Sequence, residues 1–147
     1  MRENPLVGKK VVAVHLASDG GAIKFDVEGH EPIIAHADGD CCSHSWIEYV
    51  ETPENLLGTV TAVEDVDLGK PDESNEEHEC LRFYGCKIHT ERGSSLLDYR
   101  NSSNGYYGGS LEWPGKACFY GGVFGQNVSK EEWKQIAPVN AQDGGKQ

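Results

Sequence analysis

The stretch "KKVVAVHLASDGGAIKFDVEG", residues 9–29, indicates the fold class. Its first part is rich in β-branched residues, which favour strands. Its last part alternates strictly, so that one face of a strand would carry Ile23, Phe25 and Val27 and the other face charged residues. The turn-forming residues 18–21 separate the two runs. The stretch therefore predicts a β-hairpin.

Alternation of apolar and polar residues, together with turn-forming residues, predicts further elements along the chain. Further strands are predicted at 31–36, 56–68, 80–93 and 94–102, and hairpin turns at Arg92-Gly93 and Asn104-Gly105. Residues 45–51 fit a strand or a short helix. One helix is predicted over 129–137, because Ser129 and Glu132 form a capping box and Pro138 ends the segment.

These elements predict a mainly β (α+β) protein: a curled antiparallel sheet or small barrel-like domain with one or two short helices. The length of 147 residues favours a single domain over 1–147. Residues 69–79 carry acids and no apolar side chain, which predicts a solvated acidic loop. Residues 139–147 are expected to be a frayed tail.

The net charge of −11 restricts the classes of partner. It disfavours direct nucleic-acid binding, which needs a cationic surface, but allows a partner protein with a basic surface. No apolar run reaches the length of a membrane span, and no secretory signal is recognised. We therefore expect a soluble cytoplasmic protein whose cysteines are reduced thiols.

The most unusual stretch is "HADGDCCSHSW", residues 36–46. If its second half is extended, Asp40, Cys42, His44 and Trp46 share one face and Cys41 lies on the other. Such a set of side chains is compatible with a metal site, a reactive thiol or a polar turn between strands.

Each chemical interpretation of this stretch is incomplete. A zinc site would need Cys42 and His44 plus distant ligands, and the spacing fits no standard zinc module; the distant candidates are Cys80, Cys86, His78 and His89. A thiolate–imidazole pair of Cys42 and His44 has an acid nearby to orient the ring, but residues two apart on a strand often fail to hydrogen-bond, and catalytic partners usually come from distant segments. The aspartates of "ADGD" suit a cation, but no bidentate acid completes the loop. Packing of the cysteines as small apolar residues is the preferred interpretation, and no catalytic residue, metal or cofactor is predicted.

A second unusual stretch is "DYRNSSNGYYGG", residues 98–109. Arg100 suits a phosphate or carboxylate, and Tyr106 and Tyr107 offer flat faces for a base or a partner protein. A long hairpin turn explains the same residues equally well.

Together the two stretches resemble a family of small uncharacterised proteins found in bacteriophages and bacteria. The resemblance covers roughly residues 8–113 and rests on 38–43, Ser45, Trp46 and 100–109. His44 departs from the family's small polar residue, which puts any mechanism based on His44 in doubt. No activity is established for this family, so the resemblance does not indicate one. It does imply a phage setting, in which small acidic proteins often bind a host protein.

Three functions remain open. The first is a non-enzymatic binding protein, for example an inhibitor of a CRISPR or other defence component in the host bacterial cytoplasm. Its partner-binding residues would be Asp72, Glu73, Glu76, Glu77 and Glu79. The second is a binder of a small anionic, nucleotide-like ligand. Its pocket would be lined by Asp38, Asp40, Cys42, Trp46, Arg100, Asn101, Asn104, Tyr106 and Tyr107. The third is an enzyme with Cys42 as nucleophile, and it ranks last.

Overall fold

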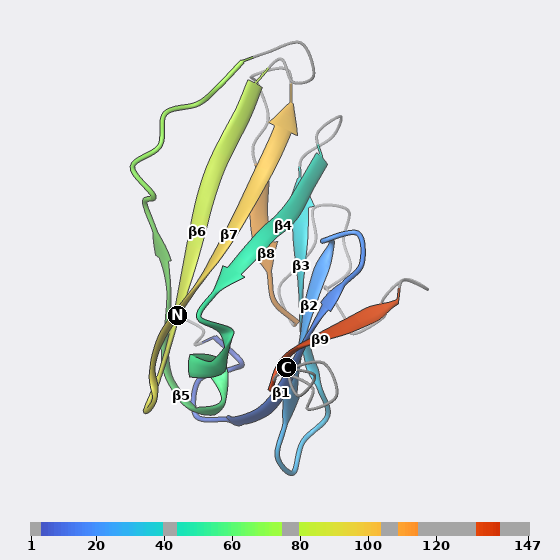
Figure 1. Cartoon of the computed structure of the whole chain (residues 1–147), viewed down its shortest axis with the longest axis vertical. Helices are drawn as coiled ribbons and strands as arrows, with labels where there is room; N and C mark the ends of the chain where they lie inside the picture. The colour runs from blue at the N-terminus through green and yellow to red at the C-terminus, as the bar shows by residue number, and fades with distance from the viewer. Residues whose placement is uncertain (1–3, 40–43, 75–79, 104–108, 115–131, 139–147) are drawn as a thin grey trace, which may run out of the picture.

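The computed structural model describes residues 4–39, 44–74, 80–103, 109–114 and 132–138. Within them the chain forms nine strands and one 3-10 helix (Figure 1). The strands are β1 (Lys10–Ala17), β2 (Ala22–Val27), β3 (Ile33–Gly39), β4 (His44–Glu51), β5 (Gly58–Val66), β6 (Cys80–Thr90), β7 (Gly93–Ser103), β8 (Gly109–Glu112) and β9 (Trp133–Ala137). The helix is η1 (Pro53–Leu56). All these strand pairs are antiparallel, so the mainly β prediction is confirmed.

The strands form one open sheet in the order β4-β7-β6-β5-β1-β2-β3-β8, with β9 added beside β1. β1 changes partner along one of its edges. It pairs with β5 through Lys10 and Val11, and with β9 from Val14 to Ala17. A register shift between Val11 and Ala13 separates these two parts. Such a bulge bends a strand and increases its twist, which explains why β1 leaves β5.

The sheet curls so that its two ends approach each other without pairing as neighbouring strands. The Ile47 amide of β4 donates to the Gly20 carbonyl at 2.7 Å, and the Gly109 amide of β8 donates to the Tyr84 hydroxyl of β6 at 3.2 Å. A single main core lies inside the curl. Its fully buried side chains include Phe25, Ile23, Val14, Leu56, Ile88 and Leu97. Burial of this apolar surface is the main force that holds the curl together.

Both predicted hairpins that can be tested are present. In β2 the apolar face predicted from the alternation, Ile23, Phe25 and Val27, is buried. β6 and β7 pair along their full length, from Thr90 opposite Gly93 outward. Gly93 adopts φ +138°, a conformation that side chains disfavour, so a glycine is required at this turn. Residues 45–51 are strand, which decides between the two expectations for this segment.

The predicted helix over 129–137 is wrong in its described part, because Trp133–Ala137 form β9. A helix this short gains little by itself in water. In the folded protein the segment pairs with the open edge of β1, and Trp133 packs against Ala17, Ala22 and Ile34. This tertiary pairing outweighs the local capping signal. Among the described residues the single helix is the four-residue 3-10 helix η1, so the prediction of one or two short helices is not confirmed.

The other predicted segments are partly described. Residues 69–74 are exposed, as predicted for an acidic loop, but the backbone of Glu73 forms a bridge with Leu81. Residues 75–79, the Asn104-Gly105 turn and the tail 139–147 lie outside the described residues. No helix in the described part of the chain is long and apolar enough to cross a membrane.

Candidate functional site

The fold brings the strands that flank the two unusual stretches together. Strand β4 pairs with β7, so that Ser45 lies opposite Asn101 and Trp46 opposite Arg100. Strand β3 pairs with β8, so that Asp38 lies opposite Ser110. One unusual stretch connects β3 to β4, and the other connects β7 to β8. Both therefore connect the β3–β8 pair with the β4–β7 pair. The two stretches belong to one region of the molecule.

On the inner side of this region, Ser45, Asn101 and Gly109 are in close contact, and we call this set the motif junction. Asn101 is 0% exposed, and its Nδ2 donates to the Ser45 hydroxyl at 2.9 Å. A Cβ on Gly109 would overlap Ser45 Oγ and lie 3.0 Å from the Asn101 Cβ. The glycine therefore allows the two ends of the curled sheet to approach. Asn101, which was predicted to bind a ligand, instead uses its amide to join β7 to β4 through Ser45.

On the outer side, six residues form the Arg100 cluster: Trp46, Glu48, Lys70, Phe83, Asp98 and Arg100. Arg100 lies between Trp46 on β4 and Phe83 on β6, and its guanidinium carbon is 4.9 Å from the Phe83 ring centre. Arg100 Nε donates to Asp98 Oδ1 at 3.1 Å.

A bulge in β4 completes the Arg100 cluster. The register shifts between Ile47 and Tyr49, so Glu48 is the extra residue. A bulge redirects a side chain, and here the Glu48 carboxylate accepts from Trp46 Nε1 at 2.8 Å and lies 4.0 Å from Arg100 Nη1. His44 stacks on Trp46, with ring centres 5.4 Å apart.

The charges in the Arg100 cluster are balanced. Two cations, Arg100 and Lys70, face two carboxylates, Asp98 and Glu48. The Asp98 side chain is 1% exposed although it lies on the outer side, and Lys70 Nζ is 3.8 Å from it. A nearly buried carboxylate needs ionic and hydrogen-bond partners, and Arg100 stabilises the fold by supplying both to Asp98. The cluster presents aromatic edges and a partly exposed guanidinium, but no surplus of positive charge.

The remaining predicted ligand residues divide into one described residue and five outside the described part. Asp38 lies in β3, two residues from half-buried His36. Burial lowers the pKa of His36 and the Asp38 carboxylate partly offsets this, so the neutral imidazole is favoured. The structure does not describe Asp40, Cys42, Asn104, Tyr106 and Tyr107.

Of the distant residues considered for a zinc site, Cys86 and His89 do not converge, and His78 lies outside the described residues. Cys86 is buried in the core, whereas His89, three residues along the same strand, projects to the other face. Both ring nitrogens of His89 are occupied, by Glu64 at 2.6 Å and by the Ser94 hydroxyl at 3.0 Å. No group of three or more metal-ligating side chains occurs among the residues that the structure describes.

The Cys86 thiol is expected to resist alkylation while the protein is folded. Burial raises its pKa to about 12, and nearby Asp65 and Glu64 add to the shift. At pH 8 only about one such thiol in ten thousand is ionised, and the thiolate is the reactive form. The measurement is iodoacetamide labelling, with and without denaturant, of a variant that keeps Cys86 and carries serine at the other four cysteines. Fast labelling of the folded variant would contradict this expectation.

Exposed acids lie on β5 and on the segment that follows it, and we call this set the acidic edge: Glu64, Asp65, Asp67, Asp72 and Glu73. Asp72 and Glu73 were predicted from the sequence, whereas Glu64, Asp65 and Asp67 were missed. The sequence signal for them is the three acids in "VEDVD", residues 63–67. This segment was predicted to be a strand, so its acids were not counted with the acidic loop. Glu76, Glu77 and Glu79 lie outside the described residues.

Part of the acidic edge already has side-chain partners. Glu64 contacts His89, and Asp72 contacts Arg82 Nε at 3.3 Å. Among the described residues, no cation lies within ion-pair distance of Asp65, Asp67 or Glu73. Asp67 Oδ1 accepts a hydrogen bond from the Gly69 amide at 2.8 Å, so within the described part of the chain these three carboxylates have no counter-charge, although Asp67 has a backbone partner.

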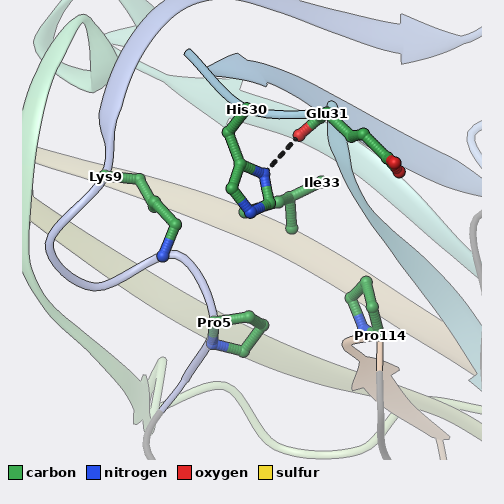
Figure 2. Close-up of a pocket in the computed structure, with 6 residues that line it drawn as sticks. All are labelled: Pro5, Lys9, His30, Glu31, Ile33 and Pro114. Carbon is green, nitrogen blue, oxygen red and sulfur yellow. Dashed lines mark hydrogen bonds between the residues drawn. The ribbon is translucent and has the colours of Figure 1, made fainter. Parts of the chain in front are cut away.

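A cavity of about 290 Å³ lies at the far end of β3 from the motif junction (Figure 2). Its lining combines prolines and an isoleucine with polar groups: Pro5, Lys9, His30, Glu31, Ile33 and Pro114. The His30 ring nitrogen Nδ1 is held 2.9 Å from the Glu31 carbonyl oxygen. None of the predicted ligand residues lines this cavity. Because Lys9 and Glu31 carry opposite charges, the lining does not favour a ligand of either charge.

The comparison with family models matches residues 4–113, which includes the curled sheet through β8 and both unusual stretches. The chain belongs to the DUF7448 family. This family is described as a domain of unknown function, so membership supports the predicted resemblance to an uncharacterised family and carries no activity. No curated protein and no solved structure matches the chain. The DUF7448 match ends at Trp113, before β9, which lies beyond the family's extent in this chain.

Proposed function

We propose that this DUF7448 protein is a non-enzymatic binding protein that occupies a basic surface of a partner protein. The observation that carries the proposal is the acidic edge. Its five exposed acids lie within ten residues, and Lys70, the one cation in that segment, is directed towards Asp98 and Phe83. A surface with one sign of charge steers an oppositely charged partner and raises the association rate.

The partner class follows from the resemblance in sequence and from charge. In a phage setting the partner would be a host protein, for example a defence component that binds nucleic acid through a basic groove. An acidic protein can compete for such a groove because it presents carboxylates where phosphates would bind. This part of the proposal rests on analogy of size and charge.

Neutralising the three carboxylates of the acidic edge that have no cation beside them in the described residues is expected to abolish capture of basic proteins. The variant is Asp65→Asn with Asp67→Asn and Glu73→Gln. The matched control removes the same charge from exposed acids elsewhere, as Glu28→Gln with Glu51→Gln and Glu54→Gln. The immobilised full chain is incubated with bacterial lysate at low and high salt, and captured proteins are identified by mass spectrometry.

The expected result is a set of basic proteins retained by the wild type and by the control, lost from the edge variant, and released by salt. Equal capture by both variants would show that binding does not depend on the acidic edge. Capture dominated by acidic or neutral proteins would contradict the proposed partner class.

The alternative is a small-ligand binder, favoured by one observation. Trp46, Arg100 and Phe83 lie in one row across three strands, and aromatic planes beside a guanidinium suit an anionic ring compound. This alternative requires that Arg100 be dispensable for stability. The balanced charges of the Arg100 cluster therefore make it the second choice.

A further inference from the structure

Among the residues that the structure describes, one edge of strand β5 has no partner strand over most of its length. On one side it pairs with β6 up to Val66 opposite Gly85. On the other side β1 pairs only with Gly58 and Thr59, and Val60 exchanges hydrogen bonds with Gly8 and Lys9. No described residue pairs with the open side from Thr61 to Val66. Figure 1 shows β5 and the segment after it along the outer margin of the molecule.

The bulges in the neighbouring strands explain this open edge. β1 bends away from β5 after Val11, and its freed edge is then covered by β9. β5 has its own register shift between Val60 and Ala62. Because the two strands diverge here, every second residue of 61–66 directs its N–H and C=O groups away from β6 into the open side. The open segment is roughly 20 Å long, enough for a peptide strand.

The side chains of this segment restrict what can pair with it. Glu64 and Asp65 are neighbours on a strand, so their carboxylates lie on opposite faces of the sheet, and both are exposed. An added strand would therefore meet a carboxylate on each face, and Asp67 follows directly. Like charges opposite each other destabilise a strand pair. A second copy of this chain paired antiparallel over 61–66 would place Glu64 of each copy diagonally across from Asp65 of the other, and these like charges disfavour the pair.

We infer that the open edge of β5 binds an extended, lysine- or arginine-bearing segment of the partner protein by β-strand addition. Main-chain hydrogen bonds to residues 61–66 would supply affinity, and basic side chains opposite Glu64 and Asp65 would supply specificity. This inference rests on the proposed function and adds to it the mode of binding and the conformation of the partner segment.

The test uses the full chain and two synthetic peptides of the same charge. One alternates lysine and threonine, and the other has the same sequence with every backbone amide N-methylated, which removes its backbone donors on both edges. Binding is measured by calorimetry, and hydrogen exchange of the backbone amides is followed by NMR. We expect the first peptide to bind about tenfold more tightly than the second. We also expect it to slow exchange at alternate amides of 61–66.

A charge variant on the same strand sharpens the test. Asp65→Lys is expected to weaken binding of the first peptide about tenfold, whereas the control Glu54→Lys, exposed on η1, leaves it unchanged. Thermal unfolding of both variants checks that the fold is retained.

Three results would overturn strand addition. Equal binding of both peptides without protection of 61–66 would leave an acidic binding surface but no added strand. Absence of binding by either peptide would reject the edge as a basic-strand site, while the lysate capture still decides the proposed function separately. Protection of 61–66 in the chain alone, rising with its concentration, would assign the edge to a second copy.

Discussion

Replacing Gly109 with alanine is expected to lower the free energy of unfolding by about 2–3 kcal/mol, because the added Cβ overpacks a closed site. The Cβ would overlap the Ser45 hydroxyl and lie 3.0 Å from the Asn101 Cβ. Ser45 cannot simply rotate, because its oxygen accepts a hydrogen bond from buried Asn101. The measurement is chemical denaturation of the variant and the wild type.

The control for the Gly109 variant is the same change in a Ser45→Ala background. Removing Oγ relieves the closest contact, although Asn101 then loses an acceptor, at a cost of about 1 kcal/mol. The two changes together should therefore destabilise the protein less than the sum of the single changes. Strict additivity would mean that Gly109 and Ser45 do not compete for the same space.

Replacing Arg100 with methionine is expected to lower the free energy of unfolding by about 2 kcal/mol. The change removes the hydrogen bond to Asp98, whose side chain is 1% exposed, and leaves that carboxylate with Lys70 at 3.8 Å. The estimate is below that for a fully buried pair because the Arg100 side chain is 21% exposed. Denaturant unfolding measures the loss.

Arg82→Met is the matched control for the Arg100 variant. Arg82 contacts the Asp72 carboxylate, which is 57% exposed, so less than about 1 kcal/mol is expected. Adding Asp98→Asn to Arg100→Met should recover part of the loss, since no buried charge then remains. If Arg100→Met left stability unchanged, Arg100 would be free for a ligand and the small-ligand alternative would become the stronger one.

Local patterns predicted several strands because burial on one face leaves a period of two in the sequence. Ile23, Phe25 and Val27 are an example, and the Arg92-Gly93 turn between β6 and β7 is another. The helix prediction over 129–137 failed for the opposite reason. A capping box is a local signal, whereas the partner of Trp133–Ala137 is the edge of β1, more than a hundred residues earlier.

For the candidate site, residue type indicated candidates but not their partners. The aspartate that holds Arg100 is only two residues away, yet its burial depends on Lys70 and on β4 and β6 beside it. Glu48 belongs to the Arg100 cluster because of a bulge in β4, and the sequence does not indicate where such a bulge occurs. Asp65 was missed because a strand residue was not expected to belong to an acidic surface.

The sequence by itself determined the strand-rich class, the strong negative charge and the two unusual stretches of this protein, because composition and period-two alternation are local properties. Only the tertiary structure decided that the two stretches share one junction, that Arg100 pairs with Asp98, and that β5 keeps an open acidic edge. These depend on contacts between distant segments, where bulges, strand order and a missing Cβ at Gly109 determine which surfaces meet.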